Sequence, residues 1–122
     1  MKKILLVTAL AFSFSALFGQ KQTWQWYFGY NASIEFSTGV PVVTNNSAMS
    51  QWEGCSSIAD ANGDLLFYTD GMSAWNKNHA VMPNSTGMLG DPSSTQSALI
   101  VPKPGSNTIY SRTSAGRTHS SR

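Results

Sequence analysis

The sequence contains one cysteine, Cys55, so the chain cannot close an internal disulfide. Small exported domains that depend on disulfides carry an even number of cysteines, because each bridge needs two. A disulfide-stapled scaffold is therefore excluded. The fold must depend on packing, on a metal ion or on more polypeptide than these 122 residues supply.

Charged residues are also scarce, at 11% of the chain, and the first 110 residues contain no arginine. Without Lys2 and Lys3 near the N-terminus, the chain has six basic and six acidic side chains. The pI of 8.9 therefore reflects the two chain ends. Because nucleic-acid binding needs a clustered basic surface, we expect no nucleic-acid partner.

One long apolar run stands at the N-terminus, where residues 4–18 carry no charge and follow Lys2 and Lys3. A run of this length is typical of a signal peptide, whereas a membrane-spanning helix needs about 20 apolar residues. We expect residues 1–19 to be removed on export, with Gln20 as the new N-terminus and no stable membrane span afterwards. The alternative is an uncleaved anchor.

A helical pattern is missing as well, because no window after residue 20 keeps apolar residues at i, i+3, i+4 and i+7. Short aromatic and β-branched segments between turn residues predict an all-β fold of short antiparallel strands and hairpins. The expected strands are residues 24–28, 34–36, 40–43, 55–59, 65–69, 74–75, 80–82, 98–101 and 108–110.

Two of these strand pairs should form hairpins. Asn62–Gly63 joins residues 55–59 to residues 65–69, and Asn-Gly is the preferred pair for a type I′ turn, in which both central residues have positive φ. Gly39 marks a turn between residues 34–36 and 40–43. Short strands separated by turns are typical of sandwiches, barrels and propellers. Four tryptophans favour the propeller, so residues 20–110 are expected to form an incomplete β-propeller-like fragment of one or two blades.

The last segment, residues 111–122, breaks the pattern. It is polar and holds all three arginines of the chain. Such a segment buries too little apolar surface to offset its ordering entropy, so it is expected to be a disordered tail. A shifted reading frame or a truncated gene would explain it, and a natural basic tail is the alternative.

The tryptophans Trp24, Trp26, Trp52 and Trp75 are candidates for stacking on a sugar ligand. Packing in the core or between blades is the favoured alternative for these large rings. No catalytic, cofactor-binding or metal-binding residue is predicted.

Four other motifs have simpler explanations than a functional site. Asp60-x-Asn62-x-Asp64 lacks the glycine and glutamate of a calcium loop and fits a hairpin turn better. No motif supports Cys55 and His79 as a catalytic pair. Acidic residues near glycine or proline favour turns over paired acids for glycoside hydrolysis. These residues are Glu53, Asp70 and Asp91. Three Asn-x-Ser/Thr matches, at Asn31, Asn45 and Asn84, fit plain loops.

Six stretches carry a family resemblance. They are Trp26–Gly29, Glu53–Ile58, Asn62–Gly71, Trp75–Asn76, Val81–Asn84 and Gly90–Gly105. In this order they resemble the N-terminal region of large secreted proteins of Bacteroidetes that are described as gliding-motility-associated or type IX secretion substrates. The resemblance covers about residues 24–110 and implies a β-propeller-like domain with further modules and a C-terminal sorting domain behind it.

The resemblance implies a cell-surface role in adhesion or motility and brings no catalytic residues. In the family another strand would follow Tyr110, where this chain turns polar. We therefore expect a non-enzymatic fragment of a secreted surface protein that is exported to the periplasm but is not anchored. Its expected partners are cell-surface polysaccharide or other surface proteins, with no cofactor. The alternatives are the N-terminal piece of a carbohydrate-active hydrolase and a small sugar-binding module that uses the tryptophans.

Overall fold

Short runs of aromatic and β-branched residues form the strands of the computed structural model. It describes residues 20–106, 109–113 and 118–121, and the predicted signal peptide, residues 1–19, lies outside them. One 3-10 turn, η1 (Lys21–Thr23), precedes the strands β1 (Gln25–Tyr27), β2 (Ser33–Glu35), β3 (Val42–Val43), β4 (Ser56–Ala59), β5 (Leu65–Thr69), β6 (Ala74–Asn76), β7 (Ala98–Pro102), β8 (Ile109–Thr113) and β9 (Thr118–Ser121). No helix within these described ranges has the length and apolarity needed to cross a membrane.

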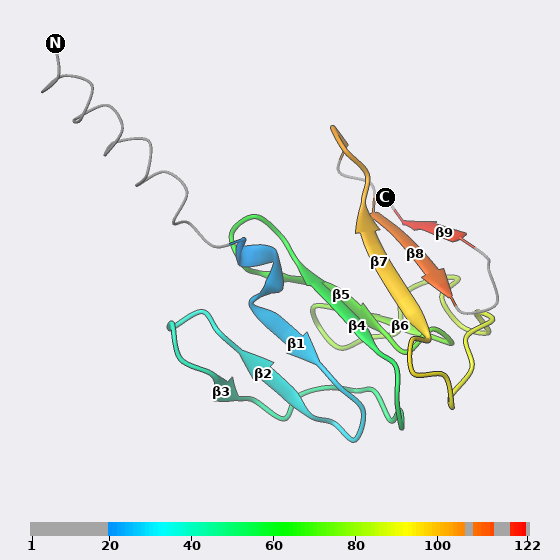
Figure 1. Ribbon diagram of the computed structural model, residues 1–122, viewed down its shortest axis with the longest axis horizontal. Coiled ribbons are helices and arrows are strands. Elements are labelled where there is room, and N and C mark those ends of the chain that lie inside the picture. The colour runs from blue at the N-terminus through cyan, green and yellow to red at the C-terminus, as the bar shows by residue number, and fades with distance from the viewer. Residues whose placement is uncertain (1–19, 107–108, 114–117, 122) are drawn as a thin grey trace, which may run out of the picture.

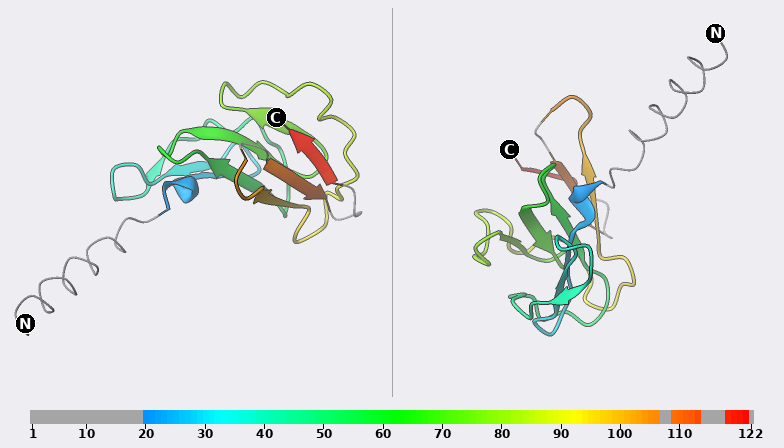
Figure 2. Two further views of the ribbon diagram at one scale, coloured as in Figure 1. Left: turned by 90° about the horizontal axis from the view of Figure 1, so that it is seen from above. Right: turned by 90° about the vertical axis from the view of Figure 1, so that its left-hand side faces the viewer.

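The strands form three antiparallel sheets of three strands each, and each sheet follows the chain order: β1-β2-β3, β4-β5-β6 and β7-β8-β9. The all-β prediction is confirmed. Three sheets form where one or two blades were expected. Figure 1 and the left view of Figure 2 show the middle sheet between the other two. The sheets meet mainly through their first strands, because β4 contacts both β1 and β7.

Two adjacent serines of β4 connect the middle sheet to both neighbours. The Ser57 hydroxyl donates to the Gln25 carbonyl of β1 at 2.7 Å and accepts from the Tyr27 amide at 3.3 Å. The Ser56 hydroxyl donates to the Ala98 carbonyl of β7 at 2.7 Å. Because successive side chains of a strand point to opposite sides, one Ser-Ser pair can serve two sheets.

The core consists of two clusters on the two faces of the middle sheet. Tyr68 of β5 stacks on Tyr27 of the first sheet, with ring centroids 4.3 Å apart and planes 12° apart. Phe67, the preceding residue, packs in the second cluster, which Ile100 and Ile109 of the third sheet join. The middle sheet is thus covered on both faces, and the outer two sheets each use one face to cover it.

The outer sheets also carry apolar side chains on their free sides, across the first sheet and on strand β7 of the third. Trp26, Ile34 and Val43 lie directly opposite one another across β1, β2 and β3, on the face away from the buried Tyr27. Trp26 and Val43 are 46% and 64% exposed. On β7 the alternation places Leu99 and Val101 away from the packed Ile100, and both are about half exposed. Both ends of the stack therefore present apolar side chains to solvent.

The two predicted hairpins form, but the first has a different turn. Gly63 has a φ of 95°, whereas Asn62 is not among the residues with positive φ. Asp60 accepts from the Gly63 amide at 3.1 Å, and its own amide donates to the Asp64 carbonyl at 2.8 Å. This pattern is a type I turn followed by a left-handed glycine, so the type I′ prediction is wrong. Residues 80–82 form an isolated bridge, Trp75 to Val81, and no strand.

The expected disordered tail also differs from the structure. β8 continues through Thr113, and Thr118–Ser121 pairs with it as β9. Paired backbone N–H and C=O groups satisfy one another whatever the polarity of the side chains, which a composition argument overlooks. Residues 114–117 and 122 lie outside the described residues. The shifted reading frame concerns the gene and stays a prediction.

Candidate functional site

The structure divides the four candidate tryptophans into two packed and two exposed rings. Trp75 stacks on Tyr68 at 5.5 Å, and the Trp24 ring lies against Gly63 and beneath the Lys21 ammonium. These two rings are packing residues, as the favoured alternative predicted. Trp26 and Trp52 remain exposed and lie on separate parts of the molecule.

Trp26 lies beside a small open cavity of about 210 Å³ between β1 and β4. Its indole N–H donates to the Thr23 carbonyl at 2.7 Å, which fixes the ring. The Phe36 ring packs against it, with 5.1 Å between the ring centroids. The serine hydroxyls of this cavity are used between the sheets. The surface around Trp26 therefore belongs to the apolar end of the first sheet and offers few free polar groups to a ligand.

Trp52 is the most exposed of the four, at 79%, and its ring lies 6.4 Å from the ring of Tyr30, which is 67% exposed. Tyr30 was not among the residues predicted to stack on a ligand. It occupies the turn between β1 and β2, where Tyr30 and Asn31 have φ values of 56° and 63° and the Ala32 amide donates to the Gly29 carbonyl. Positive φ at both central residues is the mark of a type I′ turn, and a tyrosine there gives no sequence signal because Asn and Gly are the expected residues.

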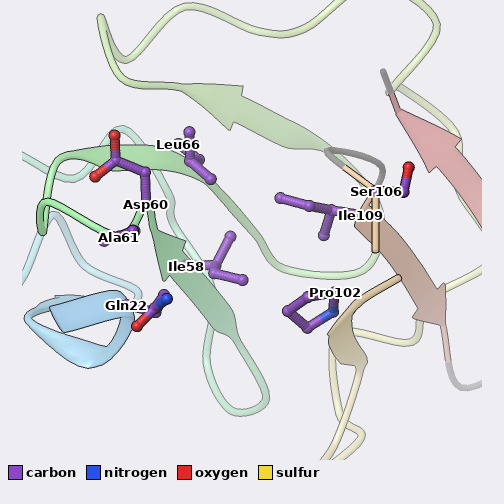
Figure 3. Close-up of a pocket in the computed structure, with 9 residues that line it drawn as sticks. Gln22, Ile58, Asp60, Ala61, Leu66, Pro102, Ser106 and Ile109 are labelled. Carbon is purple, nitrogen blue, oxygen red and sulfur yellow. The ribbon is translucent and has the colours of Figure 1, made fainter. Parts of the chain in front are cut away.

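A second cavity of about 350 Å³ opens between the middle and third sheets (Figure 3). Its apolar walls come from Ile58 and Leu66 on one side and from Pro102 and Ile109 on the other. Asp60 lies at its edge. This cavity suits an apolar group. The described polar side chains that line it do not indicate a particular ligand.

His79 lies on the buried aromatic stack. Its Nδ1 is 3.2 Å from the Tyr68 hydroxyl, which also accepts from the Ala48 amide at 2.9 Å. Burial raises the pKa values of the Tyr68 and Tyr27 hydroxyls above their ordinary value. His79 is thus a partner of Tyr68, and the structure gives it no bond to Cys55.

Cys55 packs at the side of the cluster that contains Tyr27 and Tyr68. Burial, and to a smaller extent the nearby Asp70 carboxylate, raise the pKa of its thiol. The thiolate is the reactive form of cysteine, so this environment suits a structural side chain.

Asp60, Asp70 and Asp91 accept hydrogen bonds within turns. The Asp60 carboxylate accepts from the Asn62 and Asp64 amides, and the bond from Asn62 is the main cause of its lowered pKa. Asp70 accepts from the Met72 and Ser73 amides at 2.8 and 2.7 Å. The described part of the chain holds no group of three His, Cys, Asp or Glu side chains able to bind a metal ion.

The three Asn-x-Ser/Thr asparagines share one conformation. Asn31, Asn45 and Asn84 are all exposed and all have positive φ, between 51° and 63°. Asparagine tolerates the left-handed region better than most residues, which explains its presence at these turns.

Three of the segments that carry the family resemblance meet at one tightly packed point. Ser97 is fully buried, and its hydroxyl donates to the Gly54 carbonyl at 2.9 Å. A Cβ at Gly54 or at Gly71 would collide with the Ser97 backbone, and one at Gly90 would collide with Gly71. Three separate stretches therefore meet with no space for a side chain. No family model, curated protein or solved structure matches the chain.

Proposed function

We propose that the chain is part of an exported, non-enzymatic surface protein, related to the gliding-motility-associated and type IX secretion substrates, in which it provides β-propeller-like sheets for adhesion. The observation that carries the proposal is the joining of three successive sheets through their first strands, β1, β4 and β7. In a propeller, the blades are successive antiparallel sheets around a common centre.

The packed point around Ser97 supports the family relationship. Gly54, Gly71, Gly90 and Ser97 belong to three of the stretches that carry the resemblance, and each is used where the middle sheet meets the segment before β7. Residue types that permit such close backbone approach cannot be exchanged freely. Sequence similarity at these positions is therefore tied to how the sheets are joined.

The open apolar end faces support a role within a larger assembly. A sheet face carrying Trp26, Ile34 and Val43 would be covered by another sheet in a stack that continues, as Tyr27 and Tyr68 cover each other within this one. Exposed apolar patches of this kind mark interaction surfaces.

Export is tested by expressing the full chain in a Bacteroidetes host and in a matched strain without type IX secretion. We expect the mass of the product to begin at Gln20 and the protein to collect in the periplasm of both strains. An intact N-terminus with the protein in the cytoplasm would overturn the proposal. A Leu6→Arg variant, which interrupts the apolar run, is the control and should stay uncleaved.

A further inference from the structure

Tyr30 and Trp52 are two large aromatic side chains that are exposed to solvent near the end of the β1–β2 hairpin. Tyr30 and Trp52 are exposed by two thirds or more, and their ring planes are inclined at 48° to each other with centroids 6.4 Å apart. Rings at this inclination do not cover each other's faces. Exposed apolar surface that is shared between two segments of the chain marks a binding site more often than scattered single residues do.

The backbone holds this pair in place. Tyr30 has a φ of 56°, a conformation that is unfavourable for a bulky side chain and that concentrates at functional positions. The turn is fixed by the Asn31 amide, which donates to the Met49 carbonyl at 3.2 Å. Gly29 lies so close to the Gln51 backbone that a Cβ would not fit. The hairpin turn is thus pressed against the segment that carries Trp52, and the two rings are positioned before any ligand arrives.

Gln51 holds the Trp52 segment in place from the buried side. Its Oε1 accepts from the Trp52 amide at 2.9 Å, and its side chain is 2% exposed. The Nε2 group has no hydrogen-bond partner among the residues that the structure describes. A buried donor without an acceptor costs free energy.

We propose that Tyr30 and Trp52 form a binding platform for a polysaccharide, with the C–H face of a pyranose ring against the aromatic faces. The inference rests on the proposed surface role, because it names the ligand class of that adhesion. Amide and carboxylate side chains at Asn31 and Glu53 flank the rings in the sequence and suit sugar hydroxyls. The exposed Glu53 carboxylate disfavours phosphate-bearing ligands such as nucleic acids.

The test measures depletion of the full exported chain from solution by cellulose, chitin and insoluble β-1,3-glucan, with tryptophan fluorescence as a second readout. We expect binding to at least one of the three polysaccharides. Trp52→Ala should weaken it about tenfold or more, because an aromatic contact of this kind is lost. Trp26→Ala, which removes an exposed tryptophan elsewhere, should leave it unchanged.

Tyr30→Asn distinguishes a ligand site from a structural role. Asparagine suits the left-handed first position of a type I′ turn, so this variant should melt at the same temperature as the parent or higher. Its binding should nevertheless fall about tenfold or more. Equal binding by the parent, Trp52→Ala and Tyr30→Asn proteins would overturn the proposal, and so would a folded parent protein that binds none of the three polysaccharides. These results are independent of where the chain is exported, so failure of either proposal is recognised separately.

Discussion

His79 occupies the same position in the loop after β6 that Gly63 occupies in the turn between β4 and β5. In each loop the first residue, Asn76 or Asp60, accepts through its side-chain oxygen from the amides two and four residues ahead. The fourth residue donates its amide to the carbonyl of the first and has positive φ, 60° at His79 and 95° at Gly63. Two unrelated sequences therefore make one loop, and only one of them places glycine where glycine is favoured.

This equivalence predicts that substitution of Gly63 and substitution of His79 have different effects on stability. Gly63→Ala should destabilise the protein by about 2 kcal/mol or more, because its Cβ would meet the Trp24 ring and its φ is unfavourable. His79→Gly should cost less than Gly63→Ala, since relief of the left-handed backbone offsets part of the lost hydrogen bond and ring contact with Tyr68. Urea unfolding of both variants measures the difference. A larger loss for His79→Gly than for Gly63→Ala would contradict the equivalence.

Most strands could be predicted from the sequence because aromatic and β-branched residues lie between turn residues at Gly39, Gly63 and Gly71. The exact turns could not. The sequence Asn62–Gly63 suits both a type I′ turn and a type I turn followed by a left-handed glycine. The second turn forms, together with the register shift at Ile58–Ala59 in the flanking strand. Tyr30 and Asn31 form a left-handed pair that no local preference for tyrosine indicates.

The candidate site was harder still to predict. Trp24 and Trp52 are alike in the sequence, yet the Trp24 ring packs against Gly63, 39 residues away, whereas the Trp52 ring lies beside the exposed ring of Tyr30. Exposure depends on which segments fold back over a residue, and that is set by tertiary packing. Composition indicates that aromatic residues are abundant and leaves open which of them face solvent.

Ser57 and Ser56 should contribute unequally to stability. Ser57→Ala leaves both the Gln25 carbonyl and the Tyr27 amide without their partner, so a loss of about 2 kcal/mol is expected. Ser56→Ala affects one bond, to the Ala98 carbonyl, and should cost about 1 kcal/mol. Thermal or urea unfolding followed by circular dichroism measures both. Equal losses for the two variants would contradict the predicted ranking, and no loss for either would show that the sheet contacts do not depend on these hydroxyls.

Alkaline pH should unfold the protein through its buried tyrosines. Burial raises the pKa values of Tyr27 and Tyr68 above 10.0, the ordinary value. A raised pKa in the folded state means that the associated stability is complete below about pH 10 and is lost as pH rises through the folded-state pKa values. Melting temperature recorded between pH 8 and 12 should fall steeply above pH 10. Tyr27→Phe, which removes one of the two groups, should make this fall shallower, and an unchanged slope would contradict the mechanism.

The open sheet ends should cause the chain to associate with itself. Val43 lies on the free face of the first sheet and Val101 on that of the third, so one copy can stack its first sheet on the third sheet of another. Such a head-to-tail contact does not close by itself and produces species that grow with concentration. Sedimentation velocity should show this growth for the parent protein. Val43→Lys and Val101→Lys should each suppress it, because a charge cannot be buried in an apolar contact without a partner. Val81→Lys, at an exposed valine outside both faces, is the matched control and should associate like the parent. A parent protein that stays monomeric at all concentrations would show that the end faces do not attract each other.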